Sequence, residues 1–130
     1  MSIPQVSPLN ALLGVEVLDA DDGSVELRLT PGPEHRNELG AVHGGVVTSL
    51  LDGAMGRSVG LALAEGESCA TVELSVQFMG PAEGPLVSVG RPTRLGGRIA
   101  FCEAELRTGG GELVARAHGT WALRRHPRGA

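Results

Sequence analysis

The stretch GVVTSLLDGAMGRSVGLALA, residues 45–64, is the segment of this sequence with the pattern of a long helix. At 100° per residue its larger apolar side chains fall on one broad face: Val46, Val47, Leu50, Leu51, Ala54, Met55, Val59 and Ala62. The opposite side of the same helix carries Gly45, Gly53, Gly56 and Gly60. Because each glycine costs a helix about 1 kcal/mol relative to alanine, this stripe predicts that another backbone packs closely there.

The segments around this helix have the alternating pattern of β-strands. A short helix at 7–13 and a hairpin with strands at 15–20 and 24–30 are predicted before it. Four further strands are predicted after it as an antiparallel meander, at 70–79, 86–95, 99–107 and 112–123, with glycine-rich turns between them. The expected fold class is α+β, with one long central helix wrapped by an antiparallel sheet of about six strands.

Length and charge limit the kinds of protein to which this sequence can belong. The 130 residues suit a single domain, 1–130, with a core at about 9–124 and a frayed tail at 125–130. With 11 Lys and Arg against 15 Asp and Glu, the formal net charge is −4. A phosphate-binding surface usually needs a basic stripe, so we expect no nucleic-acid partner.

No segment predicts secretion, membrane insertion or a metal site. The N-terminus lacks the basic and apolar regions of a signal peptide, and no stretch has the roughly 18 apolar residues of a membrane span. We therefore expect a cytoplasmic protein with no membrane partner. Cys69 and Cys102 have neither disulfide density nor zinc-site spacing and are interpreted as buried thiols. His35, His118 and His126 have no partners at metal-ligand spacing.

The motif with most chemical information leads into the long helix. It runs Asn37-x5-His43-Gly44-Gly45-x6-Asp52. It places an amide, an imidazole, two glycines and a carboxylate around a helix start, which attracts negative charge. The glycine N–H groups could form an oxyanion hole for a carbonyl under attack. A carboxylate on a heavily covered helix must be paired, functional or solvated at the helix edge.

The spacing of this motif separates its two ends. Nine residues of helix put His43 and Asp52 about 13.5 Å apart along the axis and about 180° apart around it. The two side chains cannot meet within one chain. If both serve one reaction, the simplest arrangement is a twofold dimer, in which His43 of one subunit faces Asp52 of the other.

Each residue of the motif also has a purely structural interpretation. Asp52 could be a solvated residue at the edge of the helix, and His43 could only cap the helix as a neutral imidazole. Gly44 and Gly45 could be a hinge between loop and helix. Asn37, in the proline-rich loop, could make only an Asx-turn.

The motif resembles that of the hotdog-fold acyl-CoA thioesterases of the phenylacetate-pathway (PaaI-like) group. The resemblance continues in the stretch ATVELSVQFMGPA, residues 70–82, and extends over about residues 9–124 in the order of helix and strands. It implies a hotdog fold and hydrolysis of an acyl-CoA thioester at a site shared across a homodimer, with dimers pairing into a homotetramer. Aryl, arylacetyl or medium-chain acyl groups are the expected substrates.

The resemblance also implies roles for individual residues. Asp52 would be the nucleophile or the general base, and the Gly44 N–H would polarise the thioester carbonyl. His43 and Asn37 would orient the thioester or water. Thr71 would lie where the family often has a Ser or Thr hydroxyl that assists from the partner subunit.

The CoA part of such a substrate carries phosphates, which need local cations on an acidic protein. Arg91, Arg94 and Arg98 flank the Gly96-Gly97 turn and could bind them, although for any one of these arginines a solvated hairpin tip is the slightly favoured interpretation. CoA is part of the substrate, so no separate cofactor and no metal are expected. Two other functions stay open: a hotdog hydratase or dehydratase acting on acyl thioesters, and a non-catalytic acyl-CoA-binding protein.

Overall fold

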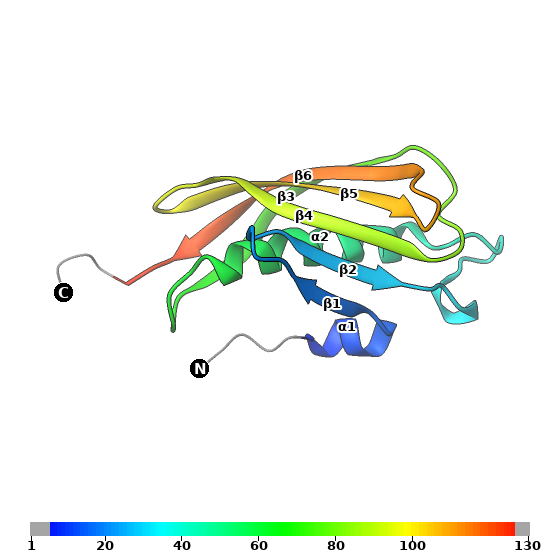
Figure 1. The fold of residues 1–130 in the computed structure, drawn as a ribbon, viewed down its shortest axis with the longest axis horizontal. Coiled ribbons are helices and arrows are strands. Elements are labelled where there is room, and N and C mark those ends of the chain that lie inside the picture. Colours follow the sequence, from blue (N-terminus) through cyan, green and yellow to red (C-terminus); the bar gives the residue numbers. More distant parts are fainter. Residues whose placement is uncertain (1–5, 127–130) are drawn as a thin grey trace.

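The computed structural model describes residues 6–126, in which one long helix runs along an antiparallel sheet (Figure 1). Its elements in chain order are α1 (Pro8–Leu13), β1 (Glu16–Asp19), β2 (Val25–Leu29), the 3-10 helix η1 (Pro33–His35), α2 (Gly44–Leu61), β3 (Ser68–Phe78), β4 (Leu86–Leu95), β5 (Ile99–Thr108) and β6 (Leu113–Arg124). The strands form a six-stranded sheet in which every pairing is antiparallel. The α+β class and the single long helix are confirmed.

The strand order corrects the predicted meander. The sheet runs β1-β2-β4-β5-β6-β3, so β4, β5 and β6 form a meander but β3 pairs with β6 instead of β4. The prediction was wrong because turn residues indicate where a strand ends and carry no information about its neighbour. As a result β3 lies at one edge of the sheet, and its free side has no strand partner among residues 6–126.

The hydrophobic core lies between α2 and the sheet face turned toward it. Along β5 the residues facing α2 are buried and the alternate residues are exposed, as expected for a sheet covered on one face. The largest fully buried side chain is that of Trp121 on β6. It lies close to α2 at Gly56, where a Cβ atom would be 3.3 Å from the indole nitrogen.

The glycine stripe of α2 has a different cause from the one predicted. Side chains pack against it: a Cβ at Gly53 would lie 2.9 Å from a methyl group of Leu27. The close backbone contact instead involves Gly90 on β4, where a Cβ would lie 2.6 Å from the carbonyl carbon of Ala54. A backbone does approach α2 closely, but the glycine that permits the approach is in the sheet.

Both helices have identifiable ends. In α1 the Ser7 hydroxyl accepts the Asn10 N–H, and Gly14 closes the helix at φ 77°. The long helix ends at Leu61, three residues before the predicted end. The carboxylate of Glu67 accepts the Ala64 N–H at 2.7 Å and so stabilises a turn where the helix could have continued.

A salt bridge connects the N-terminal hairpin to α2. The Arg57 guanidinium donates to both carboxylate oxygens of Asp19, at 2.7 and 2.8 Å. This hydrogen bonding holds the pKa of Asp19 below its usual value. In the tail, where fraying is predicted, the Arg125 side chain bonds the Gly96 carbonyl and the His126 N–H bonds Glu67; residues 127–130 lie outside the described part.

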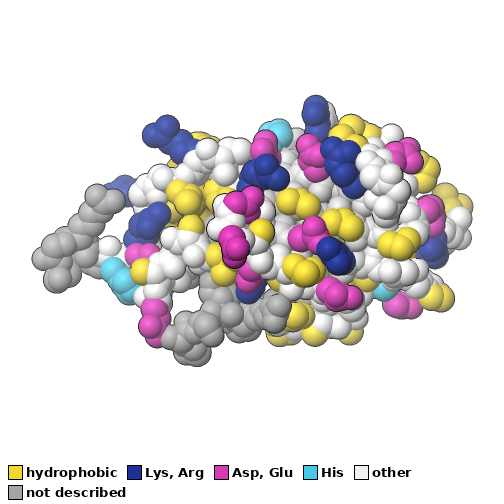
Figure 2. Space-filling model, in the orientation of Figure 1, with side chains coloured by type: hydrophobic (Ala, Val, Ile, Leu, Met, Phe, Trp, Pro, Cys, Tyr) yellow, Lys and Arg dark blue, Asp and Glu magenta, His cyan; other side chains and the backbone are white. Residues whose placement is uncertain are grey.

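Acidic and basic side chains are interspersed over most of the side of the molecule that Figure 2 shows. Within residues 6–126 no helix is long and apolar enough to cross a membrane.

Candidate active site

A small closed hairpin precedes α2 and carries two residues of the motif. Its base is a hydrogen bond in which the His43 N–H donates to the His35 carbonyl at 2.8 Å. Nearer its tip the Asn37 N–H donates to the Ala41 carbonyl at 2.8 Å. Asn37 and His43 are therefore held on one unit, residues 35–43, that continues directly into the helix.

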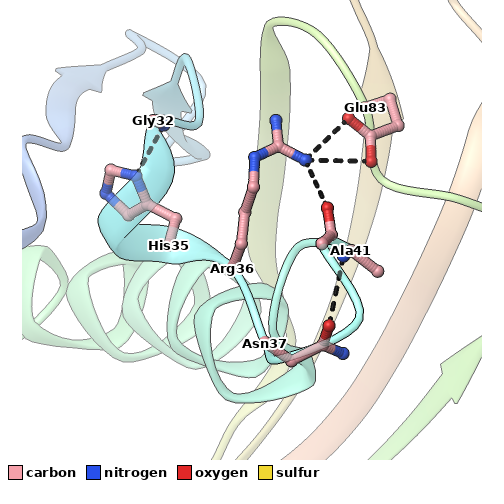
Figure 3. Close-up of polar contacts among 7 residues, drawn as sticks. Gly32, His35, Arg36, Asn37, Ala41 and Glu83 are labelled. Carbon is pink, nitrogen blue, oxygen red and sulfur yellow. Dashed lines mark hydrogen bonds and ion pairs between the residues drawn. The ribbon is translucent and has the colours of Figure 1, made fainter.

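The Asn37 side chain has both a structural role and free donors. Its Oδ1 accepts the Leu39 N–H at 3.0 Å and the Ala41 N–H at 3.1 Å, which is the Asx-turn of the structural interpretation. Figure 3 shows the bond to Ala41. The Nδ2 group has no hydrogen-bond partner among the described residues. Because only the oxygen is used, the amide can still donate to a ligand.

His43 is the N-cap of α2, and this fixes the arrangement of hydrogens on its ring. The Gly45 N–H donates to His43 Nδ1 at 2.8 Å. A neutral imidazole that accepts at Nδ1 carries its hydrogen on Nε2, so we assign that tautomer. The side chain is exposed, and its Nε2–H is available as a donor.

One backbone N–H at the start of α2 takes no part in the hydrogen bonds of the described residues. The N–H groups of Val46 and Val47 both donate to the His43 carbonyl, and that of Gly45 is used by the cap. The Gly44 N–H has no partner among the described residues. Of the two glycines predicted to form an oxyanion hole, only Gly44 keeps a free N–H at the positive end of the helix.

Asp52, farther along α2, forms a side-chain contact with β3. The Thr71 hydroxyl donates to Asp52 Oδ1 at 2.9 Å, within the same chain. Thr71 faces α2 because its position in the sheet is opposite the buried Trp121, and an irregularity in pairing follows between Thr71 and Glu73. The carboxylate is partly buried, and its Oδ2 has no partner among the described residues.

These residues form two separate groups on the chain. We call Asn37, His43 and Gly44 the loop half-site, and Asp52 and Thr71 the helix half-site. The helix is continuous from Gly44 to Leu61, so Asp52 lies about 12 Å along its axis from Gly44. The structure brings together the members of each half-site but keeps the two half-sites apart.

The three arginines expected at the CoA phosphates lie away from the loop half-site. The turn that contains Arg98 is at the opposite end of the molecule from the hairpin 35–43 (Figure 1). Arg91 lies on the sheet face turned away from α2, because its neighbour Gly90 contacts that helix and side chains alternate along a strand. All three arginines, Arg94 included, are exposed.

The cysteines differ in burial and neither is prepared to act as a nucleophile. Cys102 is buried, and burial raises the pKa of its thiol to about 12. Cys69 is only partly buried, so its interpretation as a buried thiol is half right. Burial and the negative charge of Asp52 raise the pKa of Cys69. Within residues 6–126 no group of three His, Cys, Asp or Glu side chains could hold a metal ion.

Sequence reasoning missed an aromatic neighbour of the loop half-site. Ring atoms of Phe78, at the end of β3, lie 3.5 and 3.6 Å from the position that a Cβ at Gly44 would occupy. The Phe78 side chain is nevertheless 58% exposed. Strand alternation could have placed it on the same face as Val76, but its proximity to the helix start depends on how β3 crosses α2.

The comparisons with known proteins assign the family. The sequence matches the family model of the thioesterase superfamily over residues 39–115. The chain belongs to the thioesterase superfamily. A Halobacterium salinarum relative, named "putative esterase", is 34% identical over 105 residues, covering 77% of this chain and 70% of the relative.

Two solved structures are similar along nearly the whole chain. A Bacillus halodurans protein, whose crystal structure was determined with CoA, is 33% identical with a TM-score of 0.86, over 96% of this chain and 83% of that one. A phenylacetic acid degradation-related protein from Ralstonia eutropha is 31% identical with a TM-score of 0.83, over 92% of each chain. The hotdog fold and the assignment as a thioester hydrolase are thereby confirmed.

Proposed function

We propose that this thioesterase hydrolyses acyl-CoA, releasing CoA and a free acid, with aryl, arylacetyl or medium-chain acyl groups as substrates. The observation that carries the proposal is the division of polar groups along α2. Considering the described residues alone, the start of the helix has hydrogen-bond donors without partners, and farther along lies the Asp52 carboxylate, with Oδ1 hydrogen-bonded and Oδ2 free. Hydrolysis of a thioester needs both an oxyanion donor and an acceptor that attacks or activates water.

The donors act on the thioester carbonyl. The Gly44 N–H, at the positive end of the helix, stabilises the negative charge that develops on the carbonyl oxygen. His43 Nε2–H and Asn37 Nδ2 orient the thioester or the attacking water. Thr71 fixes Oδ1 of Asp52, so that Oδ2 points its lone pairs to the reacting group.

Asp52 can act in two ways. As a nucleophile, its carboxylate attacks the carbonyl carbon, the C–S bond breaks, and a mixed anhydride is left for water to hydrolyse. As a general base, it takes a proton from water, which attacks the same carbon, and the proton passes to the departing thiolate. Oxygen-18 in the Asp52 carboxylate after one turnover in labelled water would identify the first route. Neither route needs a cofactor.

The site is completed by a second copy of the chain. Among the described residues the outer edge of β3 has no strand partner, and the strand carries Thr71 and the 62% exposed Val72. Antiparallel pairing of two such edges about a twofold axis places both copies of α2 on the same side of a continuous sheet. The start of one α2 then faces the middle of the other, where Asp52 lies. We propose that these dimers pair further into a dimer of dimers.

The same twofold arrangement supports a role in phosphate binding for Arg94 and Arg98, near the turn between β4 and β5. In Figure 1 the hairpin 35–43 and the β4–β5 turn lie at opposite ends of one chain. Antiparallel protomers would therefore bring the hairpin of one to the same end as the turn of the other. Arg94 and Arg98 are then available for the CoA phosphates, whereas Arg91, on the outer sheet face, fits this role less well. The similar structure determined with CoA supports CoA as the thiol part of the substrate. The phenylacetic acid degradation-related protein supports an arylacetyl group as the acyl part.

The substrate is tested by thiol release from a panel of acyl-CoAs of increasing size, with Asp52→Ala as the background control. We expect the wild-type protein to release CoA from an aryl, arylacetyl or medium-chain thioester well above this background. Tight binding of acyl-CoA without CoA release from any substrate would overturn the proposal and favour a binding protein.

A further inference from the structure

His35, on η1, is buried although it lies at the base of a hairpin whose tip, residues 38–41, is exposed. Only 3% of its surface is accessible, and both of its ring nitrogens are hydrogen-bonded. The Gly32 N–H donates to Nδ1 at 2.8 Å (Figure 3). The hydrogen of the neutral ring is therefore on Nε2, which donates to the Leu13 carbonyl at 2.7 Å.

The ring connects parts of the chain that are distant in sequence. Leu13 is the last residue of α1, and a carbonyl at a helix C-terminus lacks a partner within the helix. His35 donates to that carbonyl and at the same time accepts the N–H of Gly32, the residue before η1. A buried side chain with two such bonds has a fixed position, because losing either bond leaves a buried polar group unpaired.

The backbone of His35 connects this fixed side chain to the loop half-site. Its carbonyl accepts the His43 N–H, which closes the base of the hairpin 35–43. The next residue, Gly44, carries the free N–H. On the other side of the hairpin, Arg36 donates to the carboxylate of Glu83 and to the Gly40 carbonyl (Figure 3).

We infer that His35 is a positioning residue for the reaction: it fixes the hairpin and thereby sets where Asn37, His43 and the Gly44 N–H meet the thioester. This inference rests on the proposed thioesterase function. A shift of about 1 Å in such donors can reduce the rate roughly 100-fold, although His35 itself does not touch the substrate. A histidine that only filled the core would affect stability and leave the geometry of the donors unchanged.

The chain offers variants that separate these two roles. In His35→Asn the amide oxygen takes the place of Nδ1 and keeps the bond to Gly32. In His35→Gln the amide nitrogen takes the place of Nε2 and keeps the bond to Leu13. His35→Phe keeps the ring volume and loses both bonds. Val25→Ala, at a fully buried position of β2, is the control for loss of stability without a change at the hairpin.

The experiment measures kcat, KM and Tm for these variants, together with amide hydrogen exchange of residues 36–44. We expect kcat of His35→Phe to fall roughly 100-fold, those of the Asn and Gln variants to fall about 10-fold, and that of Val25→Ala to stay within about twofold, with KM little changed in all. Amide exchange in the hairpin should be faster in the His35 variants alone.

The outcomes separate this inference from the proposed function. If the folded His35 variants keep kcat within about twofold of wild type, or if Val25→Ala loses as much kcat at equal loss of Tm, the positioning role is wrong. If His35→Phe does not fold, the Asn and Gln variants are judged by the same criterion. If the wild type hydrolyses no acyl-CoA, the proposed function fails, and hairpin exchange alone decides whether His35 orders the loop.

Discussion

The loop half-site and the helix half-site are built in different ways. In the loop half-site, backbone hydrogen bonds, the Asx-turn of Asn37 and the helix cap of His43 fix the chain. Among the described residues they leave only donors unused, at Asn37, His43 and Gly44. In the helix half-site, one hydroxyl fixes a carboxylate and leaves an acceptor unused. One chain keeps its donors about 12 Å from its acceptor, so neither can satisfy the other. This separation is the reason for proposing a dimer in which each chain contributes complementary halves to two sites.

The largest loss of kcat is expected when Asp52, the acceptor of the helix half-site, is changed. Asp52→Asn keeps the size of the side chain but removes the negative charge that attacks or takes a proton. We expect kcat for CoA release to fall roughly 1000-fold with little change in Tm. Steady-state kinetics and thermal unfolding measure both quantities. A variant with more than a tenth of wild-type kcat would show that Asp52 is only a solvated residue of α2.

The second largest loss of kcat is expected when the Asn37 donor of the loop half-site is removed. Asn37→Asp keeps the oxygen of the Asx-turn but replaces the donating amide, and Asn37→Ala removes both. We expect kcat to fall roughly 100-fold in each, because the free Nδ2 donor is lost either way. If Asn37→Asp retained wild-type kcat, the turn alone would explain Asn37.

A smaller effect is expected where the helix half-site is positioned. Thr71→Val removes the hydrogen bond to Asp52 but keeps the branched shape, and we expect kcat to fall about 10-fold. Thr71→Ser keeps the hydroxyl and serves as the matched control, with kcat expected within about twofold of wild type. Equal kcat values for Thr71→Val and Thr71→Ser would mean that Asp52 needs no such orientation.

The smallest effect on kcat is expected at the salt bridge between Asp19 and Arg57, which joins β1 to α2. Folding lowers the pKa of Asp19, so this bridge stabilises the protein above the unfolded pKa of about 4 and less as pH falls through the folded pKa. Asp19→Asn should lower the free energy of unfolding by about 1 kcal/mol at pH 7. In urea unfolding the difference should shrink at pH 3, with kcat at pH 7 unchanged. A difference that did not depend on pH would contradict the assignment.

The sequence pattern predicted the features that depend on neighbouring residues. The span of α2, the N-terminal hairpin and the separation of His43 from Asp52 all follow from periodicity and helix geometry. The position of β3 could not be predicted, because strand order depends on contacts between distant segments. For the same reason the contact of Thr71 with Asp52 and the bonds of His35 to Gly32 and Leu13 were not foreseen. Burial of His35 is decided by the fold around it, not by its local sequence.

The most direct measurement of the central claim is activity after mixing two inactive variants, Asn37→Ala and Asp52→Asn. Each heterodimer then has one site with both defects and one site with neither, if the sites are shared between subunits. With random exchange at equal concentrations, we predict recovery to about a quarter of wild-type activity. Mass spectrometry of the mixture confirms that the subunits have exchanged. No recovery despite exchange would contradict the account, because it would place each complete site within a single chain.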